Sequence, residues 1–224
     1  MLLPYKNRTQ AGRELAEALR PYANRPDVLI LALPRGGVPV AYEVAKALNT
    51  PLDLMLVRKL GLPGHEELAV GAIATGGIRV LNTEVIQGLA IPEAQIEWIA
   101  AAELQELRRR EKAYRGERPS LEVQGRCVIL IDDGLATGAT MQAAIAAIRQ
   151  QRPAEIVVAV PVAPPDTVAL LREQADAVIC PATPELFLGV GRWYEDFTQI
   201  TDAEVRDLLG RIWQEQPERE SSKV

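Results

Sequence analysis

Short, wholly apolar runs recur along this chain, and segments with helical periodicity lie between them. Such a run predicts a strand buried on both faces, because a half-exposed strand would alternate apolar and polar residues. The predicted strands cover residues 28–33, 52–57, 127–131, 156–160 and 177–180. The predicted helices cover residues 7–20, 38–48, 92–114, 139–151, 165–174 and 202–214. Strands and helices that alternate at this spacing predict an α/β fold with a doubly wound, mostly parallel sheet.

The bulk composition fits a single soluble domain. The chain has 224 residues, of which 48% are hydrophobic, which is enough for a substantial core. It has no apolar run near the ~20 residues of a membrane helix, and its first residues lack the apolar stretch of a signal peptide. A net charge of −5 leaves no basic footprint for nucleic acid. We therefore expect a cytoplasmic protein with neither a nucleic-acid nor a membrane partner; whether it forms a homo-oligomer stays open.

Cysteine and histidine are too few to suggest a metal centre of their own. Cys127 and Cys180 both lie in apolar runs, which favours reduced thiols over a disulfide. A single histidine and the lack of a Cys/His cluster argue against a zinc site.

Three unusual loops follow predicted strands. They are PRGG at 34–37, RKLG at 58–61 and DDGLATGAT at 132–140. The carboxyl ends of parallel strands meet at one edge of a sheet, where ligands bind in folds of this class. We therefore expect the three loops to open on one crevice.

The loop at 132–140 combines two carboxylates with a run of small residues. Residues 136–140, ATGAT, would present backbone N–H groups at a helix N-terminus, which suits a phosphate, and Thr137 and Thr140 add hydroxyl donors. Asp132 and Asp133 would repel a phosphate but suit sugar hydroxyls or a divalent cation. Together these features predict a site for a phosphorylated ribose.

Alternative roles for this loop account for fewer of its features. The G-x-x-x-x-G-K-[ST] and G-x-G-x-x-G phosphate motifs are absent. A phosphorylation receiver also has acidic residues at strand ends, but its companion features are missing. A tight strand-to-helix turn with a capping aspartate is the purely structural alternative.

The stretch VILIDDGLATGAT at 128–140 resembles the thirteen-residue signature of type I phosphoribosyltransferases, which bind 5-phosphoribosyl-1-diphosphate (PRPP). It departs from that signature at Gly134, where the family usually has an aliphatic residue. The resemblance implies that Asp132 and Asp133 hold the ribose hydroxyls, and that the cofactor Mg²⁺ is reached through those hydroxyls or water. It also implies a 5′-phosphate wrapped by Ala136, Thr137, Gly138, Ala139 and Thr140. We expect neutralising either carboxylate to weaken PRPP binding. It should not unfold the chain, because paired carboxylates repel each other in the empty site.

The loop ALPRGGVPVA at 32–41 resembles the diphosphate loop of the same family, closest to the xanthine-guanine type. Independently of the resemblance, Gly36 and Gly37 allow close backbone approach, and Arg35 offers a fork of donors. The resemblance further implies a cis peptide bond between Pro34 and Arg35. A plain Gly-Gly turn is the alternative.

Residues 58–77 are rich in glycine and predict a long loop with a short strand at 68–73. At its start, Arg58 and Lys59 would help to neutralise the leaving diphosphate, unless they are ordinary surface basic residues. The resemblance sets a mobile lid at 61–76. His65 receives no role, and Glu67 could orient a base or a water. The predicted catalytic set is Arg35, Lys59, Asp132 and Asp133.

A C-terminal element is the expected hood over an acceptor base. Flat rings suit stacking on a base, and this element contains Phe187, Trp193, Tyr194 and Phe197. The first three are the predicted base-binding residues; packing of the last helix onto the sheet is the alternative. In 6-oxopurine enzymes the family usually has an aspartate where this chain has Ala136, so hypoxanthine and guanine are disfavoured as acceptors.

The expected organisation is one phosphoribosyltransferase domain over 1–224, with a core at 28–180, a helical insertion at 83–119 and a hood at 181–215. The set of motifs resembles a group of predicted phosphoribosyltransferases of unassigned substrate. The expected function is transfer of phosphoribose from PRPP to a small acceptor such as a nucleobase, with release of diphosphate. The alternative is a non-catalytic regulator that senses PRPP or a nucleotide.

Overall fold

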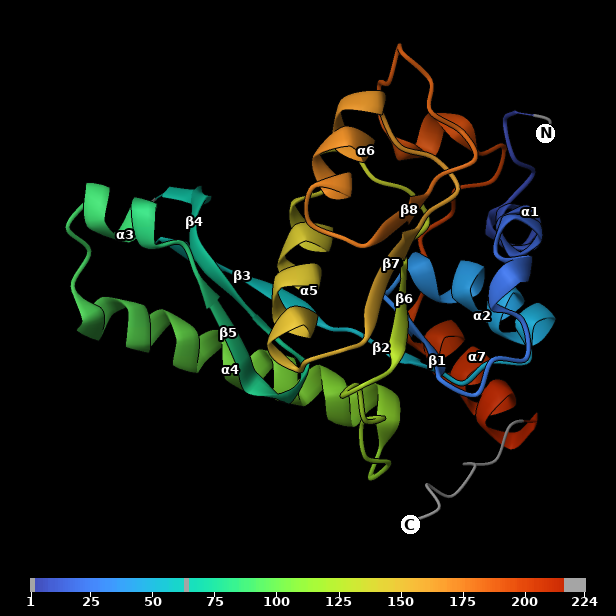
Figure 1. Ribbon diagram of the computed structural model, residues 1–224. Helices are drawn as coiled ribbons and strands as arrows, with labels where there is room; N and C mark the ends of the chain where they lie inside the picture. The colour runs from blue at the N-terminus through green and yellow to red at the C-terminus, as the bar shows by residue number, and fades with distance from the viewer. Residues whose placement is uncertain (1–2, 63–64, 216–224) are drawn as a thin grey trace.

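The computed structural model describes residues 3–62 and 65–215 (Figure 1). The helices are α1 (Arg8–Ala18), α2 (Gly37–Leu48), α3 (Thr83–Gly88), α4 (Glu93–Arg115), α5 (Ala139–Gln150), α6 (Pro165–Arg172) and α7 (Asp202–Glu215). The strands are β1 (Val28–Ala32), β2 (Leu52–Leu54), β3 (Val57–Leu62), β4 (His65–Ala74), β5 (Ile78–Leu81), β6 (Cys127–Ile131), β7 (Glu155–Ala159) and β8 (Ala177–Ile179). None of the described helices is long and apolar enough to cross a membrane.

The main sheet has five parallel strands in the order β2-β1-β6-β7-β8. The chain winds from β1 outward to β2 on one side, and from β6 outward to β7 and β8 on the other. The winding therefore reverses between β1 and β6, which is where sheets of this kind bind ligands. The predicted doubly wound, mostly parallel fold is confirmed.

Helices cover both faces of this sheet, with α1, α2 and α7 on one side and α5 and α6 on the other (Figure 1). Alternate residues of each strand feed the two cores. Ile30 and Ile129 pack with α1, α2 and α7, whereas Leu31 and Leu130 pack with α5 and α6. Burial on both faces explains why these strands are continuous apolar runs.

A second sheet occupies most of the segment predicted as a long loop at 58–77. The short strand predicted at 68–73 lies within β4, but the long loop around it is wrong. Strands β3, β4 and β5 form an antiparallel sheet, and Leu60 and Ile73 are buried in the core that includes residues of α4. Gly71 suggested a loop, yet its role is close strand approach: a Cβ there would lie 2.2 Å from the Val80 carbonyl oxygen. Within the predicted lid at 61–76, residues 63 and 64 lie outside the described residues; the rest is the end of β3, β4 and a tight turn.

The insertion predicted at 83–119 is helical and consists of α3 and α4. Helix α4 extends along the second sheet and returns to the main domain (Figure 1). Its last residue, Arg115, forms a buried ion pair with Asp53 of β2, with 2.7 Å between Nε and Oδ1, and also donates to the Leu54 carbonyl. This ion pair fixes the end of the insertion to the edge of the main sheet.

The N-terminal segment pairs with the segment predicted to be the C-terminal hood. The Tyr5 N–H donates to the Trp193 carbonyl and the Glu195 N–H donates to the Tyr5 carbonyl, both at 2.8 Å. The Tyr5 hydroxyl donates to the Pro161 carbonyl, and the rings of Tyr5 and Tyr194 lie 5.6 Å apart. The segment predicted to be the hood is therefore packed against the N-terminal end of the described chain.

Candidate functional site

The carboxylate pair lies at the end of β6, directly against the PRGG loop that follows β1. A Cβ on Gly36 would lie 2.0 Å from Oδ2 of Asp133. A Cβ on Gly37 would lie 2.7 Å from the Ile131 carbonyl oxygen and 2.9 Å from the Asp132 Cα. Only glycine fits at both positions. Two of the three loops expected to open on one crevice, those at 34–37 and 132–140, therefore do meet. The third, at 58–61, is part of β3.

Arg35 lies at the mouth of this site. The Pro34–Arg35 peptide bond is cis, as the resemblance implied. Arg35 Nη1 lies 3.5 Å from Oδ1 of Asp202, the first residue of α7, and the Tyr114 hydroxyl donates to the same oxygen at 2.8 Å. The Tyr114 hydrogen bond and the nearby Arg35 charge lower the pKa of Asp202. The C-terminal helix thus holds the guanidinium beside the PRGG loop.

Arg8 also belongs to this site, a role that was not predicted from the sequence. Its Nε lies 2.7 Å from Oδ2 of Asp133, its Nη1 donates to the Thr198 carbonyl at 2.8 Å, and its Cζ lies 4.0 Å from the Phe197 ring centroid. Arg8 and Asp133 are both buried. One feature of the sequence could have indicated a special role for Arg8. It is the first residue of α1, where the helix dipole disfavours a cation.

The two carboxyls have unequal surroundings. Burial and the charge of Asp133 raise the pKa of Asp132 well above its usual range. Burial also raises the pKa of Asp133, but there Arg8 opposes the shift. The Asp133 N–H donates to Oδ1 of Asp132 at 2.8 Å. Charge is therefore costly at Asp132 in the free protein, and a ligand that supplies donors or positive charge would relieve that cost.

The small-residue loop forms the start of α5. Gly138 is the N-cap residue with φ +71°, and Ala136, Thr137, Ala139 and Thr140 are exposed. Thr167 of α6 secures the loop by donating to the Ala136 carbonyl at 2.6 Å. The Ala139 N–H donates to the Thr137 hydroxyl oxygen at 3.5 Å. The first helical turn, with the dipole behind it, suits an anion such as a phosphate.

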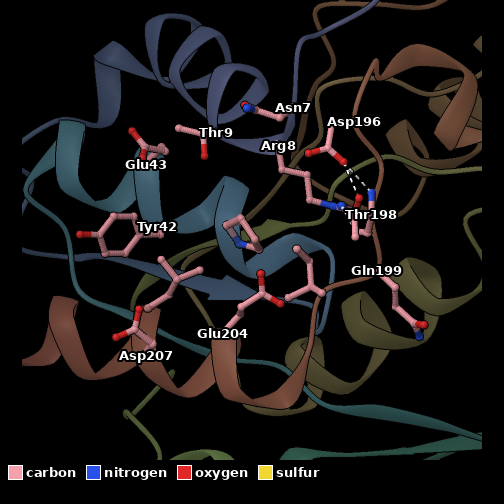
Figure 2. A pocket seen from close by; sticks show the side chains of 13 residues that line it. Asn7, Arg8, Thr9, Tyr42, Glu43, Asp196, Thr198, Gln199, Glu204 and Asp207 are labelled. Carbon is pink, nitrogen blue, oxygen red and sulfur yellow. Dashed lines mark hydrogen bonds between the residues drawn. The ribbon is translucent and has the colours of Figure 1, made fainter.

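A cavity of about 320 Å³ lies over the acid pair. Its lining residues are Arg8, Pro34, Arg35, Gly36, Asp132, Asp133, Phe197, Gln199 and Ile200. A second cavity of about 360 Å³ adjoins it and shares Arg8, Gln199 and Ile200. Figure 2 shows Arg8 reaching from α1 toward Thr198 at the edge of this second cavity. Two arginines and two carboxylates in one cavity suit a ligand that has both phosphate and hydroxyl groups.

The structure does not bring Arg58 and Lys59 into the lining of this cavity. Both lie on β3, where Arg58 Nε is 2.6 Å from Glu103 Oε2 of α4 and Lys59 is exposed. Their predicted roles toward the diphosphate remain predictions. Glu103 gives Arg58 a local partner that the sequence did not reveal.

The predicted base-stacking residues also lie outside the lining of that cavity. Phe187 and Trp193 stack on each other, with centroids 6.3 Å apart. Tyr194 is buried, and its hydroxyl donates to the Asp133 carbonyl. Tyr194 therefore supports the acid pair from behind, while the aromatic ring that lines the cavity is that of Phe197.

Magnesium would need oxygens from a ligand at this site. Among the described residues, no three His, Cys, Asp or Glu side chains are grouped to hold a metal ion. A carboxylate pair beside a phosphate-binding loop nevertheless fits Mg²⁺, which commonly keeps water and substrate oxygens among its ligands. Asp132 and Asp133 are the residues that would hold it, directly or through ligand hydroxyls.

A family model for the phosphoribosyl transferase domain matches residues 1–191. The chain belongs to this family. A curated relative, "Putative phosphoribosyl transferase Rv0571c" of Mycobacterium tuberculosis (strain ATCC 25618 / H37Rv), is 45% identical over 207 residues, which are 92% of this chain. Those residues are 46% of the relative, so this chain spans about half the relative's length.

Two solved structures are similar to this chain. TT1426 from Thermus thermophilus is 43% identical, with a TM-score of 0.82 over 92% of this chain and 97% of that chain. The purine phosphoribosyltransferase from Pyrococcus horikoshii is 20% identical, with a TM-score of 0.48 over 87% of this chain and 92% of that chain. The likeness to TT1426 covers nearly the whole of both chains.

Proposed function

We propose that this chain transfers phosphoribose from PRPP to a nitrogenous base or a similar small acceptor, with Mg²⁺, and releases diphosphate. The observation that carries the proposal is the meeting of three groups at one switch point. Asp132 and Asp133 lie against the PRGG loop, and the α5 N-terminus follows them in the chain. In a member of the phosphoribosyl transferase domain family, this arrangement matches the hydroxyls and phosphates of PRPP.

Each group has a role set by its chemistry. The loop at 136–140 would bind the 5′-phosphate, and the carboxylates would accept the ribose hydroxyls. Arg35 and the backbone of Gly36 and Gly37 would bind the diphosphate. During transfer the bond from C1 to the diphosphate oxygen breaks, a bond from C1 to an acceptor nitrogen forms, and the electron pair leaves with the diphosphate. A cation aimed at that leaving group lowers the barrier, and Arg35 supplies one.

Two further contributions belong to the proposal. Mg²⁺, when bound, would neutralise part of the diphosphate charge. Asp132 and Asp133 would hold it, directly or through ligand hydroxyls. Lys59 would add positive charge toward the leaving group, as its place after the second predicted strand suggested from the sequence. Because Lys59 is exposed, we expect its contribution to turnover to be smaller than that of Arg35.

The acceptor is a small nitrogenous ring other than a 6-oxopurine. Ala136 cannot exchange a proton with a purine ring nitrogen, whereas 6-oxopurine enzymes usually have an aspartate there. We therefore propose hypoxanthine and guanine as poor acceptors. A cytoplasmic setting is consistent with the thiols: Cys127 and Cys180 are unpaired, and burial raises the pKa of Cys127 to about 12.

Diphosphate release from PRPP and Mg²⁺, measured over a panel of nucleobases, tests the proposal. We expect release that requires one base and falls at least tenfold in Asp132→Asn, a loss typical of one charge-assisted hydrogen bond. PRPP binding without release on any base would favour the alternative, a non-catalytic PRPP or nucleotide sensor. Equal release by wild type and Asp132→Asn would remove the acid pair from the mechanism.

A further inference from the structure

We propose that Arg8 is a positioning residue for sugar recognition. It fixes the Asp133 carboxylate so that the acid pair can accept ribose hydroxyls, and it ties that carboxylate to the C-terminal segment. The inference rests on the proposed function, because it concerns how the same site recognises the sugar of PRPP.

Three contacts give the Arg8 side chain one defined geometry. The ion pair with Asp133 holds Nε, the Thr198 carbonyl holds Nη1, and the Phe197 ring lies under the guanidinium. Arg8 is only 8% exposed. A planar guanidinium that is bonded on two sides and stacked on a ring cannot turn without losing several interactions together. Arg8 is therefore a rigid support for the carboxylate next to it.

One oxygen of each carboxylate accepts a hydrogen bond from Arg8 or from the backbone. Arg8 donates to Oδ2 of Asp133, the oxygen packed against Gly36, and the Asp133 N–H donates to Oδ1 of Asp132. The two carboxyls also hydrogen-bond each other. Arg8 and the Asp133 N–H thus fix one oxygen of each acid, and hydroxyl donors of a ligand would replace the hydrogen bond between the two acids.

These contacts indicate that Arg8 positions the Asp133 carboxylate and does not block the sugar site. A cation that blocked the site would cover the oxygens that the sugar needs, whereas Arg8 holds the oxygen on the Gly36 side. Without Arg8, Asp133 would lose its counter-charge beside Asp132, and its carboxylate could rotate. We therefore expect loss of Arg8 to damage hydroxyl recognition and to leave phosphate recognition intact.

Two sugar phosphates isolate that effect. Ribose 5-phosphate and 2-deoxyribose 5-phosphate share the phosphate and differ by one hydroxyl. Calorimetry should show that the wild type prefers the ribose by about tenfold, the scale of one charge-assisted hydrogen bond. In Arg8→Met the preference should fall to about twofold or less, with a smaller loss of affinity for the deoxy sugar, which has one hydroxyl fewer to lose. The matched control is Arg13→Met, which removes an exposed ion pair with Glu43 from the same helix and should retain the wild-type preference.

Each other outcome overturns the inference. Equal weakening of both sugars in Arg8→Met would mean a general packing role, and tighter ribose binding would mean that Arg8 inhibits. An unchanged preference would remove Arg8 from sugar recognition. If Arg8→Met does not fold, Arg8→Lys, which keeps the charge but not the fork, must show a reduced preference. Failure of the wild type to bind either sugar would instead contradict the proposed function on which this inference rests.

Discussion

Arg8 and Asp133 form a buried ion pair, with 2.7 Å between Nε and Oδ2, at the centre of the candidate site. The pair joins the start of α1 to the end of β6 across 125 positions of sequence. It also gives the two adjacent aspartates different electrostatic surroundings, because Asp133 is paired with Arg8 and Asp132 lies beside that pair without a cation of its own. From the sequence alone, the two acids were equivalent.

The first prediction concerns this inequality. From the sequence we expected neither substitution to be structurally costly, but the ion pair with Arg8 changes that expectation for one acid. Asp133→Asn should destabilise the protein by about 3–5 kcal/mol, because it leaves the Arg8 charge buried without a partner. Asp132→Asn should be as stable as wild type or more so, since it removes a costly charge and keeps its acceptor oxygen. Urea unfolding at neutral pH measures both. The double variant Arg8→Met/Asp133→Asn should recover much of the loss; if it does not, the cost is not the unpaired charge.

The second prediction concerns pH. The folded pKa of Asp132 is raised by burial and by the Asp133 charge, so folded protein holds this proton at pH values where the unfolded chain has lost it. Stability from this group is therefore present below about pH 4, the unfolded pKa, and is lost as pH rises through the folded pKa. The melting temperature of Asp132→Asn minus that of wild type should increase between pH 4 and pH 7. A flat difference would mean that Asp132 ionises normally.

The third prediction concerns Gly134, where the chain departs from the family signature. A Cβ there would lie 2.6 Å from Cγ1 of Val190 in the hood and 3.0 Å from Cγ1 of Val162. Gly134→Ala should therefore cost about 1–3 kcal/mol in urea unfolding through overpacking. Adding Val190→Ala should restore part of that stability. If Gly134→Ala is neutral, the hood does not press on this loop.

The fourth prediction concerns Arg35. Arg35→Ala should weaken PRPP binding by about 10–100-fold, as expected for a lost charge-assisted pair, and should weaken nucleoside monophosphate binding much less. Asp202→Asn is the matched control, because it removes the partner of Arg35 but keeps the guanidinium. Equal losses for the two ligands would mean that Arg35 does not face the diphosphate.

The main sheet was predictable because its strands are buried on both faces. A short apolar run such as 127–131 predicts a buried strand. In a parallel sheet, the loops that follow such strands lie together at one edge of the sheet. The position of Asp132 and Asp133 against Gly36 and Gly37 followed from that topology.

The parts that sequence did not predict depend on contacts between distant segments. Gly71 signals close strand approach only when Val80 is known to lie beside it. Arg8 resembles any other charged helix residue until β6 brings Asp133 to it. Tyr194 looked like a base-stacking ring, but the N-terminal segment covers it and leaves its hydroxyl for the Asp133 backbone.

The most direct test of the account is calorimetric titration of the whole chain with PRPP, with and without Mg²⁺. We predict saturable binding that Mg²⁺ strengthens and that Asp132→Asn weakens at least tenfold. A nucleoside 5′-monophosphate should compete for the same site. No binding of either ligand to the folded wild-type protein would contradict both the transferase and the sensor, because each needs this pocket.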